Sequence, residues 1–217
     1  MKQPFLIGIT GGSCSGKTAI ARVLSRRLEG NAAAVISMDS YYIDLSHVPE
    51  SERALRNFDH PDAIDFPYLI DHLKHLLAGD EILVPAYDFA SHTRAPGGGG
   101  HALRLPARAE KRPVVILEGL HAFYNEEIRG LEDIRIFIDC DPETCLSRRI
   151  GRDTRERGRD ADSVRSQWRG TVMPMYSSFV EPAKAFAEII IKGERPVEES
   201  VRKILEHRFF QNMLEDN

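Results

Sequence analysis

The chain has 217 residues, a formal net charge of −4 and a hydrophobic content of 42%. This length suits one large domain or two small ones, and the composition is that of an ordinary globular protein. The net negative charge gives no support for a nucleic-acid partner, and no apolar run is long enough for a membrane span. Three cysteines fit neither a disulfide framework nor a metal-ligand spacing, which favours a reducing cytoplasm.

A phosphate-binding loop is predicted near the start of the chain. A glycine, four residues and then Gly-Lys-Thr fit the pattern in which backbone N–H groups cradle phosphates. The lysine of this pattern reaches the β- and γ-phosphates, and the threonine hydroxyl can ligate Mg²⁺. A helix that starts near the end of the loop adds partial positive charge. The predicted nucleotide-binding residues are Gly11, Gly12, Ser13, Cys14, Ser15, Gly16, Lys17, Thr18 and Ala19.

The surroundings of the loop agree with this interpretation. Residues 5–9 are apolar and predict a short buried strand that leads into the loop. Ile20, Val23, Leu24 and Leu28 then recur at helical spacing. Because strand, loop and helix follow in the required order, a nucleotide site is favoured over a glycine-rich turn that binds nothing.

A second buried strand is predicted over residues 33–36, and Asp39 follows it. Ligands of parallel α/β sheets lie beyond the carboxyl ends of the strands. A carboxylate at that place could accept a proton from a hydroxyl or support a metal ion. From spacing alone, a helix cap or turn residue is an equally good explanation of Asp39.

The middle of the chain predicts one helix and a small β insertion. Pro67 opens the helix and Gly79 ends it. Residues 82–85 and 103–106 read as short strands, and four glycines at 97–100 between them suggest a mobile hairpin tip. We therefore predict a β insertion from about 82 to 106, too small to be an independent domain.

An acidic residue follows another apolar strand, predicted over residues 114–117. Downstream of a phosphate loop, Glu118 at this place is the second signature of a nucleotide site, where a carboxylate holds Mg²⁺ or its waters. Alternating isoleucines at 134–138 predict the next strand. Asp141 and Pro142 then predict a helix start, with a capping carboxylate and a proline at the first position.

Six arginines lie between residues 148 and 159, interspersed with acids and glycines. Such a run is usually a solvated helix face. After a phosphate loop, however, it favours a lid over about 148–160, in which arginines neutralise the transferring phosphoryl group and glycines permit motion.

The remaining elements complete an α/β pattern. We predict a helix that Pro174 kinks or ends, a strand over 188–191, and a closing amphipathic helix from Val197 to Phe209. Strands alternate with helices, which predicts a parallel sheet with helices on both faces, as in P-loop NTPases. The whole of 1–217 is predicted to form a single kinase domain.

Several stretches together resemble the uridine kinase (uridine-cytidine kinase) family of P-loop nucleoside kinases. They cover the phosphate loop, Asp-Ser-Tyr-Tyr at 39–42, Phe-Asp-His-Pro-Asp-Ala at 58–63, Tyr-Asp-Phe-x-x-His-x-Arg at 87–94, residues 114–119 and the arginine run. The segments at 58–63 and 87–94 are much more specific to this family than the phosphate loop is. The resemblance spans nearly the whole chain.

The resemblance implies roles on the nucleoside side of the site. Asp39 would be the general base facing the 5′-hydroxyl, and Tyr42 would line the site. Asp59 would bind the ribose hydroxyls with Arg149 beside it. Aromatic side chains suit a flat base, and a carboxylate can accept two hydroxyls.

The resemblance also implies that three residues contact the pyrimidine and that a fourth helps to close the substrate site. Tyr87, Phe89 and His92 would hold the base, with His92 at its polar edge. Gln167 would help to close the substrate site. These assignments belong to the family pattern and are expectations for this chain.

On the phosphate side, Thr18 and Glu118 would organise Mg²⁺. Lys17 and Arg152 would act in catalysis, and Arg159 would also meet phosphates. The implied reaction is transfer of a phosphoryl group from ATP (or GTP) to uridine and cytidine, in pyrimidine salvage. The family also implies a homotetramer, and the net charge and the lack of a long apolar run predict neither nucleic-acid nor membrane partners.

Two alternatives stay open at this point. One is another P-loop kinase of a small metabolite, such as phosphoribulokinase, and the other is a nucleotide-binding regulatory protein. The aromatic segment at 87–92 argues against a bare sugar phosphate, which has no base to stack. Residues 97–100 and 191–195 depart from the family pattern, and the latter region borders the adenine in the family.

Overall fold

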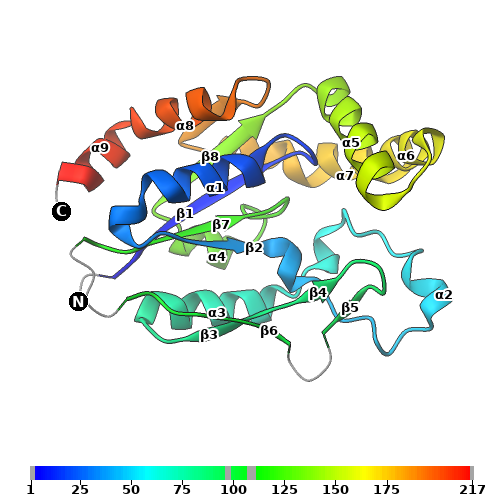
Figure 1. Ribbon diagram of the computed structural model, residues 1–217, viewed down its shortest axis with the longest axis horizontal. Coiled ribbons are helices and arrows are strands. Elements are labelled where there is room, and N and C mark those ends of the chain that lie inside the picture. The colour runs from blue at the N-terminus through cyan, green and yellow to red at the C-terminus, as the bar shows by residue number, and fades with distance from the viewer. Residues whose placement is uncertain (1–2, 96–98, 107–110, 216–217) are drawn as a thin grey trace.

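The computed structural model of the protein describes residues 3–95, 99–106 and 111–215, and its centre is a sheet of five parallel strands (Figure 1). The strand order is β2-β7-β1-β8-β9. The strands are β1 (Phe5–Gly11), β2 (Ala34–Ser37), β7 (Val114–Glu118), β8 (Ile134–Asp139) and β9 (Ile189–Lys192). This arrangement confirms the predicted α/β class with a parallel sheet.

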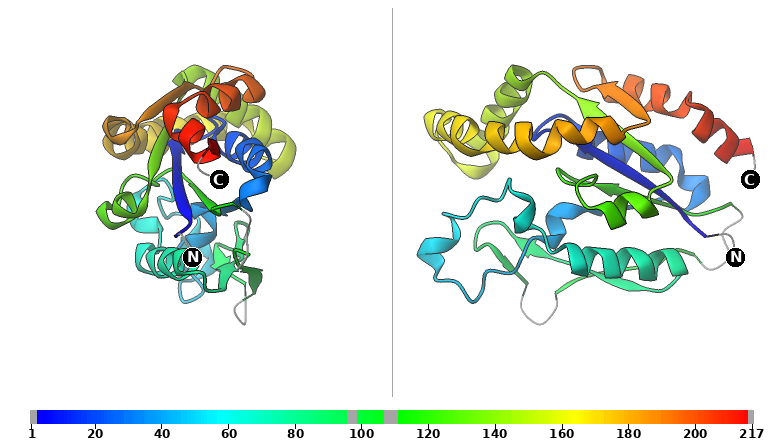
Figure 2. Two further views of the ribbon diagram at one scale, coloured as in Figure 1. Left: turned by 90° about the vertical axis from the view of Figure 1, so that its left-hand side faces the viewer. Right: turned by 180° about the vertical axis from the view of Figure 1, so that it is seen from behind.

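Helices cover both faces of the sheet, so its central strands are buried on both sides (Figure 2). One face packs against α1 (Lys17–Arg27), α8 (Val197–Leu205) and α9 (Arg208–Glu215). The other packs against α3 (Phe66–Ala78) and α4 (Glu126–Leu131). Successive side chains of β1 point to opposite faces of the sheet, so Leu6 lies in one core cluster and Ile7 in the other.

Two helices begin and end where local sequence signals predict. The Asp65 carboxylate caps α3 by accepting the N–H of Tyr68 at 3.2 Å, and Gly79 ends the helix with φ +94°. Asp141 caps α5 (Pro142–Arg157) by accepting the N–H of Thr144 at 2.9 Å. These bonds satisfy N–H groups that have no partner within the helix.

The small β elements differ from the prediction in one strand. β3 (Ile82–Pro85) pairs antiparallel with β6 (Gly100–Leu103), whereas the sequence predicted a strand over 103–106. Gly100 is the first paired residue of β6, and a Cβ there would be 2.2 Å from the Val84 carbonyl oxygen, so glycine permits this close pairing. Of the predicted glycine tip, Gly97 and Gly98 lie outside the described residues. Between β3 and β6, β4 (Tyr87–Asp88) pairs with β5 (Thr93–Arg94).

Of the two outcomes expected at Pro174, a kink or an end of the helix, the end does not occur. α6 (Ala161–Gln167) continues through a π-helical turn, Trp168–Val172, into α7 (Met173–Met175) and a second π-helical turn, Tyr176–Val180. Pro174 lies just after the first π-helical turn, inside this continuous helical path. The predicted closing helix is also divided, because α8 ends at Leu205 and α9 starts at Arg208. No helix within the described ranges is long and apolar enough to cross a membrane.

Glu132 places a carboxyl group inside the core, between α4 and β8. The residue is 8% exposed, and neither carboxyl oxygen has a hydrogen-bond partner among the described residues. Gly8 on β1 makes room for it, because a Cβ there would lie 2.1 Å from Oε1 of Glu132. Burial raises the pKa of Glu132 well above its usual value, while Arg135 opposes the increase. The folded protein therefore favours the protonated acid.

We expect Glu132→Gln to remove a pH dependence from the stability of the fold. Because the folded pKa is raised, the folded protein holds this proton to higher pH than the unfolded chain does. The free energy of unfolding of the wild-type protein therefore falls as the pH rises above about 4.3, the usual value for Glu. Glu132→Gln should be more stable than wild type at pH 8 by about 1–3 kcal/mol, with a smaller difference at pH 5.

Urea unfolding between pH 5 and pH 8 measures this difference. Glu81→Gln is the control, because Glu81 is exposed and its replacement should leave the wild-type slope unchanged. A Glu132→Gln variant with the wild-type slope would contradict the assignment.

Candidate active site

Three segments of the predicted site meet at the carboxyl edge of the sheet. The phosphate loop follows β1, Asp39 follows β2, and Glu118 is the last residue of β7. Close packing joins the last two segments, because a Cβ on Gly119 would lie 2.5 Å from the Cβ of Met38. The parallel sheet thus brings together residues that are far apart in the sequence.

The phosphate loop is bent in a way that depends on glycine. Gly11 has φ +151°, and a Cβ there would lie 2.5 Å from the carbonyl oxygen of Ile138. Lys17 begins α1, and its Nζ donates to the Gly12 carbonyl oxygen at 3.2 Å. The lysine therefore lies over the loop at a helix N-terminus, which is a suitable place for an anion.

Thr18 and Glu118 could hold a divalent cation together with a nucleotide. The Thr18 hydroxyl donates to Oε2 of Glu118 at 3.1 Å, and Glu118 is 3% exposed. No group of three or more His, Cys, Asp or Glu side chains that could hold a metal occurs in the part of the chain that the structure describes. Mg²⁺ usually takes one or two protein oxygens and completes its shell with waters and substrate phosphates. The two oxygen donors fit that pattern.

Two carboxylates flank Tyr42 beside the loop. Burial raises the pKa of Asp59, with Arg149 and Lys17 opposing the rise and Asp39 adding to it. Burial also raises the pKa of Tyr42 well above its usual value, and the charges of Asp39 and Asp59 contribute to the rise. The structure thus brings the two predicted acids into one electrostatic neighbourhood with the loop lysine.

A buried histidine that the sequence did not single out holds the Asp59 backbone. Nε2 of His121 lies 2.9 Å from the Asp59 carbonyl oxygen and can donate to it. Burial lowers the pKa of His121 to about 4, so the ring is neutral at physiological pH. His121 follows β7 by only three residues, but its contact partner is remote in the chain, so no local pattern indicates it.

Aromatic side chains gather next to these acids. The ring centroids of Tyr42 and Tyr87 are 5.3 Å apart, and Phe89 lies 5.3 Å from Tyr87. Phe58 stacks on His92 with centroids 4.3 Å apart and an angle of 15° between the rings. We call these five side chains the aromatic group. Phe58 is its unpredicted member, although it directly precedes Asp59.

Two polar atoms of the aromatic group are buried without a partner. The Tyr87 hydroxyl and Nδ1 of His92 form no hydrogen bond within the described residues. Burial lowers the pKa of His92 and raises that of Tyr87 to about 12, so both side chains are neutral. Buried polar atoms normally have partners, so this arrangement suits a ligand with its own donors and acceptors.

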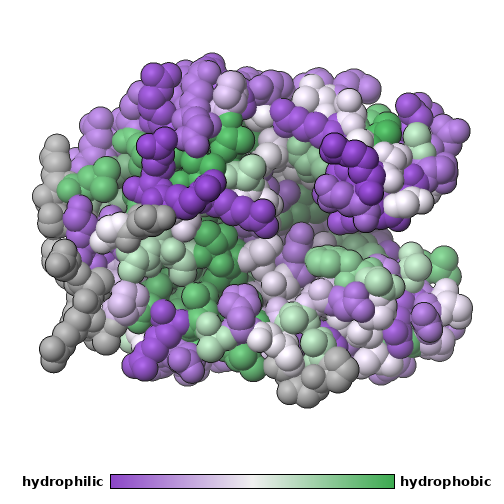
Figure 3. Space-filling view, in the orientation of Figure 1, coloured by the Kyte–Doolittle hydropathy of each residue, from purple (hydrophilic) through white to green (hydrophobic). Residues whose placement is uncertain are grey.

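The arginine run is tied to the phosphate loop through α5 and α6. Nη1 of Arg149 donates to the Ser13 hydroxyl at 2.9 Å. Oε1 of Gln167 accepts from Arg149 at 3.2 Å and from Arg159 at 2.6 Å. Hydrogen bonds therefore link three of the predicted residues, Arg149, Gln167 and Arg159, directly. Figure 3 shows a cleft between this α5–α6 region and the segment around α2 and β5.

A fully buried carboxylate organises these arginines. Asp153 is 0% exposed and forms ion pairs with Arg152 at 2.8 Å, Arg159 at 3.5 Å, Arg149 at 3.6 Å and Arg157 at 3.7 Å. Nε of Arg152 also donates to the Asp153 carboxylate, at 2.9 Å. Asp153 was not among the predicted site residues, although its position four residues after Arg149 indicates a helical ion pair.

The glycines of the arginine run behave differently from each other. Gly151 lies inside α5, and Gly158 ends that helix with φ +62°. Only Gly158 has a backbone conformation that favours glycine. Of the two glycines that suggested a hinge, one therefore serves as a helix end.

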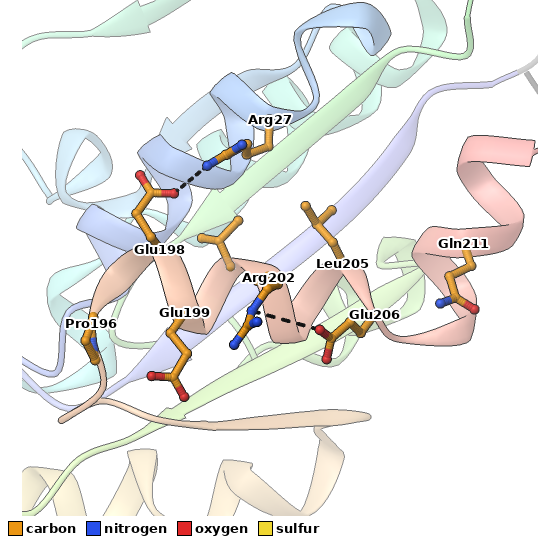
Figure 4. Close-up of a pocket in the computed structure, with 9 residues that line it drawn as sticks. Arg27, Pro196, Glu198, Glu199, Arg202, Leu205, Glu206 and Gln211 are labelled. Carbon is orange, nitrogen blue, oxygen red and sulfur yellow. Dashed lines mark hydrogen bonds and ion pairs between the residues drawn. The ribbon is translucent and has the colours of Figure 1, made fainter.

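A cavity of about 700 Å³ lies elsewhere, beside α1 and α8 (Figure 4). The ion pair between Arg27 and Glu198, 2.8 Å long, joins the two helices. The residues that line the cavity include none from the phosphate loop or the aromatic group. We therefore treat it as separate from the candidate active site.

The fold and the site define a P-loop kinase. The chain belongs to the phosphoribulokinase / uridine kinase family, whose model matches residues 6–199. A protein named uridine kinase from Chloroflexus aggregans is 43% identical over 191 residues, which cover 88% of each chain. A uridine kinase from Lactobacillus helveticus is 43% identical over 200 residues, which cover 91% of each chain.

Solved structures confirm the fold. D-glycerate 3-kinase from Cryptococcus neoformans matches with a TM-score of 0.64 at 17% identity, over 90% of this chain and 88% of that one. Phosphoribulokinase from Rhodobacter spheroides matches with a TM-score of 0.59 at 19% identity, over 91% and 75% of the two chains. At such low identity these likenesses show the fold alone.

We expect Asp153→Asn to destabilise the arginine cluster. The substitution keeps the size of the side chain and leaves four guanidinium groups without their carboxylate. Removing one partner of a buried ion pair typically costs about 3–5 kcal/mol, so the free energy of unfolding should fall by about 3 kcal/mol. Trypsin should also cleave faster between residues 148 and 159.

Urea unfolding and timed proteolysis measure the two effects. Asp162→Asn is the matched control, because its carboxylate is 95% exposed and pairs with Arg165 at the surface. Such pairs contribute about 0–1 kcal/mol, so this variant should resemble wild type. Equal losses in both variants would contradict a special role for Asp153.

Proposed function

We propose that the protein transfers the terminal phosphoryl group of ATP to the 5′-hydroxyl of uridine and cytidine. The observation that carries the proposal is the aromatic group beside the phosphate loop, with the unpartnered polar atoms of Tyr87 and His92. A flat base with polar edges could stack there and pair with both atoms. The uridine kinases that share 43% identity with the chain support the same acceptor.

The proposed chemistry needs positioned charges more than covalent help from the protein. The nucleoside 5′-oxygen attacks the γ-phosphorus, the bond between that phosphorus and the β–γ bridging oxygen breaks, and ADP leaves. Lys17 and the arginines of the cluster would neutralise the charge that the phosphoryl oxygens carry. Mg²⁺, held by Thr18 and Glu118, would add positive charge at the phosphates when bound.

Asp39 and Asp59 would have different tasks. Asp39 is exposed at the end of β2, next to the loop, and would accept the proton of the 5′-hydroxyl. Asp59 is held by His121 and lies near Arg149 and Lys17, which suits a carboxylate that binds two ribose hydroxyls. Tyr42 would separate the two and line the sugar.

The other assignments form part of the same proposal. We propose one kinase domain over 1–217, with the β3–β6 segment as an insertion and residues 148–160 as a lid over the phosphates. The phosphate donor is ATP, and GTP is the second candidate. A homotetramer, a cytoplasmic location and a role in pyrimidine salvage follow from the family resemblance, and Leu83 on β3, which is 47% exposed, is compatible with a contact between subunits.

Phosphoribulokinase is the closest rival, since its name forms part of the family description. It is not favoured, because the curated relatives at 43% identity are named uridine kinases and the described site carries the aromatic group. A sugar phosphate would leave the polar atoms of Tyr87 and His92 unpaired.

A substrate panel tests the function directly. Uridine, cytidine, thymidine, adenosine, pantothenate and ribulose 5-phosphate are each incubated with ATP and Mg²⁺, and ADP release is measured. We expect turnover with uridine and cytidine. Turnover with ribulose 5-phosphate alone would replace the proposal by the rival activity, and Lys17→Ala should abolish turnover with every substrate.

Asp39→Asn and Asp59→Asn should have separable kinetic effects. Asp39→Asn keeps the shape and removes the base, so kcat should fall by about 10²–10⁴ with a modest change in nucleoside affinity. Asp59→Asn should mainly raise the KM for uridine and narrow the difference between uridine and 2′-deoxyuridine, because the contact to the 2′-hydroxyl is impaired. Steady-state kinetics with both substrates measure the effects, and a reversed pattern would exchange the two roles.

A further inference from the structure

Arg53 joins two loops, one of which carries His92 of the aromatic group. It is the last residue of α2 (Glu50–Arg53), and it is half-buried. Its guanidinium donates to three backbone carbonyl oxygens. They belong to Val48 at 2.8 Å, Ser91 at 3.0 Å and Ser46 at 3.2 Å. Arg53 thus connects the segment before α2 to the turn between β4 and β5.

That turn carries His92 in a conformation that needs support. His92 has φ +55°, which is unfavourable for a residue with a Cβ. Within the turn, the Asp88 carboxylate accepts the Ala90 N–H at 2.8 Å and the Ser91 hydroxyl at 2.7 Å. From outside, the Leu45 N–H donates to the His92 carbonyl oxygen at 3.3 Å. The same loop that Arg53 binds therefore also holds His92 directly.

We propose that Arg53 is a positioning residue for recognition of the nucleobase, which rests on the proposed function. Its bonds to Val48 and Ser46 anchor the guanidinium, and its bond to Ser91 fixes the turn, so that Nδ1 of His92 and the Tyr87 hydroxyl keep their places relative to each other. The planar guanidinium can donate in three directions at once from a fixed fork. Lysine keeps the charge but is a point donor on a flexible stem, so it cannot replace that fork.

The charge of Arg53 is consistent with this placement. Burial lowers the pKa of His92, Asp88 opposes that effect, and Arg53 lowers the pKa further. Arg53 also lowers the pKa of Tyr87 against the larger effect of burial. Both base-facing groups therefore lie within electrostatic reach of the same guanidinium, which favours a neutral imidazole.

Arg53→Lys is the decisive variant, with kcat and the KM values for uridine and ATP as readouts. We expect the KM for uridine to rise about tenfold, with kcat and the KM for ATP changed by less than about twofold. Arg56→Lys is the matched control, because Arg56 is exposed on the same segment and should behave as wild type. A parallel loss of uridine and ATP affinity in Arg53→Lys would indicate a general structural role and overturn the proposal.

His92→Ala separates this inference from the proposed function. If the uridine KM is unchanged in His92→Ala, the proposed base site is wrong and the role of Arg53 is wrong with it. If His92→Ala raises the uridine KM but Arg53→Lys does not, only the inference about Arg53 is overturned. A rise in both variants, with ATP affinity retained, supports it.

A measurement on the wild-type protein keeps the proposal testable if Arg53→Lys fails to fold. Hydrogen exchange is followed by mass spectrometry with and without uridine. The Leu45 amide and the peptide spanning 88–93 should already be protected without uridine, because the turn is fixed in advance. Rapid exchange there, slowed only by uridine, would show that the nucleoside and not Arg53 orders the turn.

Discussion

The parallel pairing of β1 with both β7 and β8 is the constraint on which the site depends. Ile7 lies opposite Ile116 on one side and Ile134 on the other. A shift by one residue would move Leu6 and Ile7 to the wrong faces, so core packing fixes the register. The loop after β1 and Glu118 therefore meet at a fixed offset, and the bond from Thr18 to Glu118 follows from it.

The charges at this edge show how a site can hold arginines before a phosphate arrives. Four guanidinium groups surround the Asp153 carboxylate, which leaves an excess of positive charge beside the loop. Without that carboxylate, the arginines would repel one another around a buried position. Asp153 thus maintains a cluster that remains attractive to an anion, while Arg149 connects the cluster to Ser13.

The sequence predicted those parts of the fold that have local causes. The strand, loop and helix at the start and the caps at Asp65 and Asp141 depend on neighbouring residues. The start of β6 depends on its pairing with β3, and no local signal indicated the path through Pro174 or the break after Leu205. The same division applies to the site, because motifs indicated Asp59 and His92, whereas the contacts of these residues with His121 and Phe58 join distant parts of the chain.

The two halves of the candidate site consequently rest on different forces. The phosphate half lies at the ends of core strands, where a substitution would disturb the sheet. The aromatic half lies on loops. Polar contacts hold these loops, such as the hydrogen bond from Leu45 to His92, and few core side chains contribute. Loops can be remodelled at little cost to the core. A family that unites phosphoribulokinase and uridine kinase could therefore keep one phosphoryl-transfer edge and change the acceptor through the loops alone.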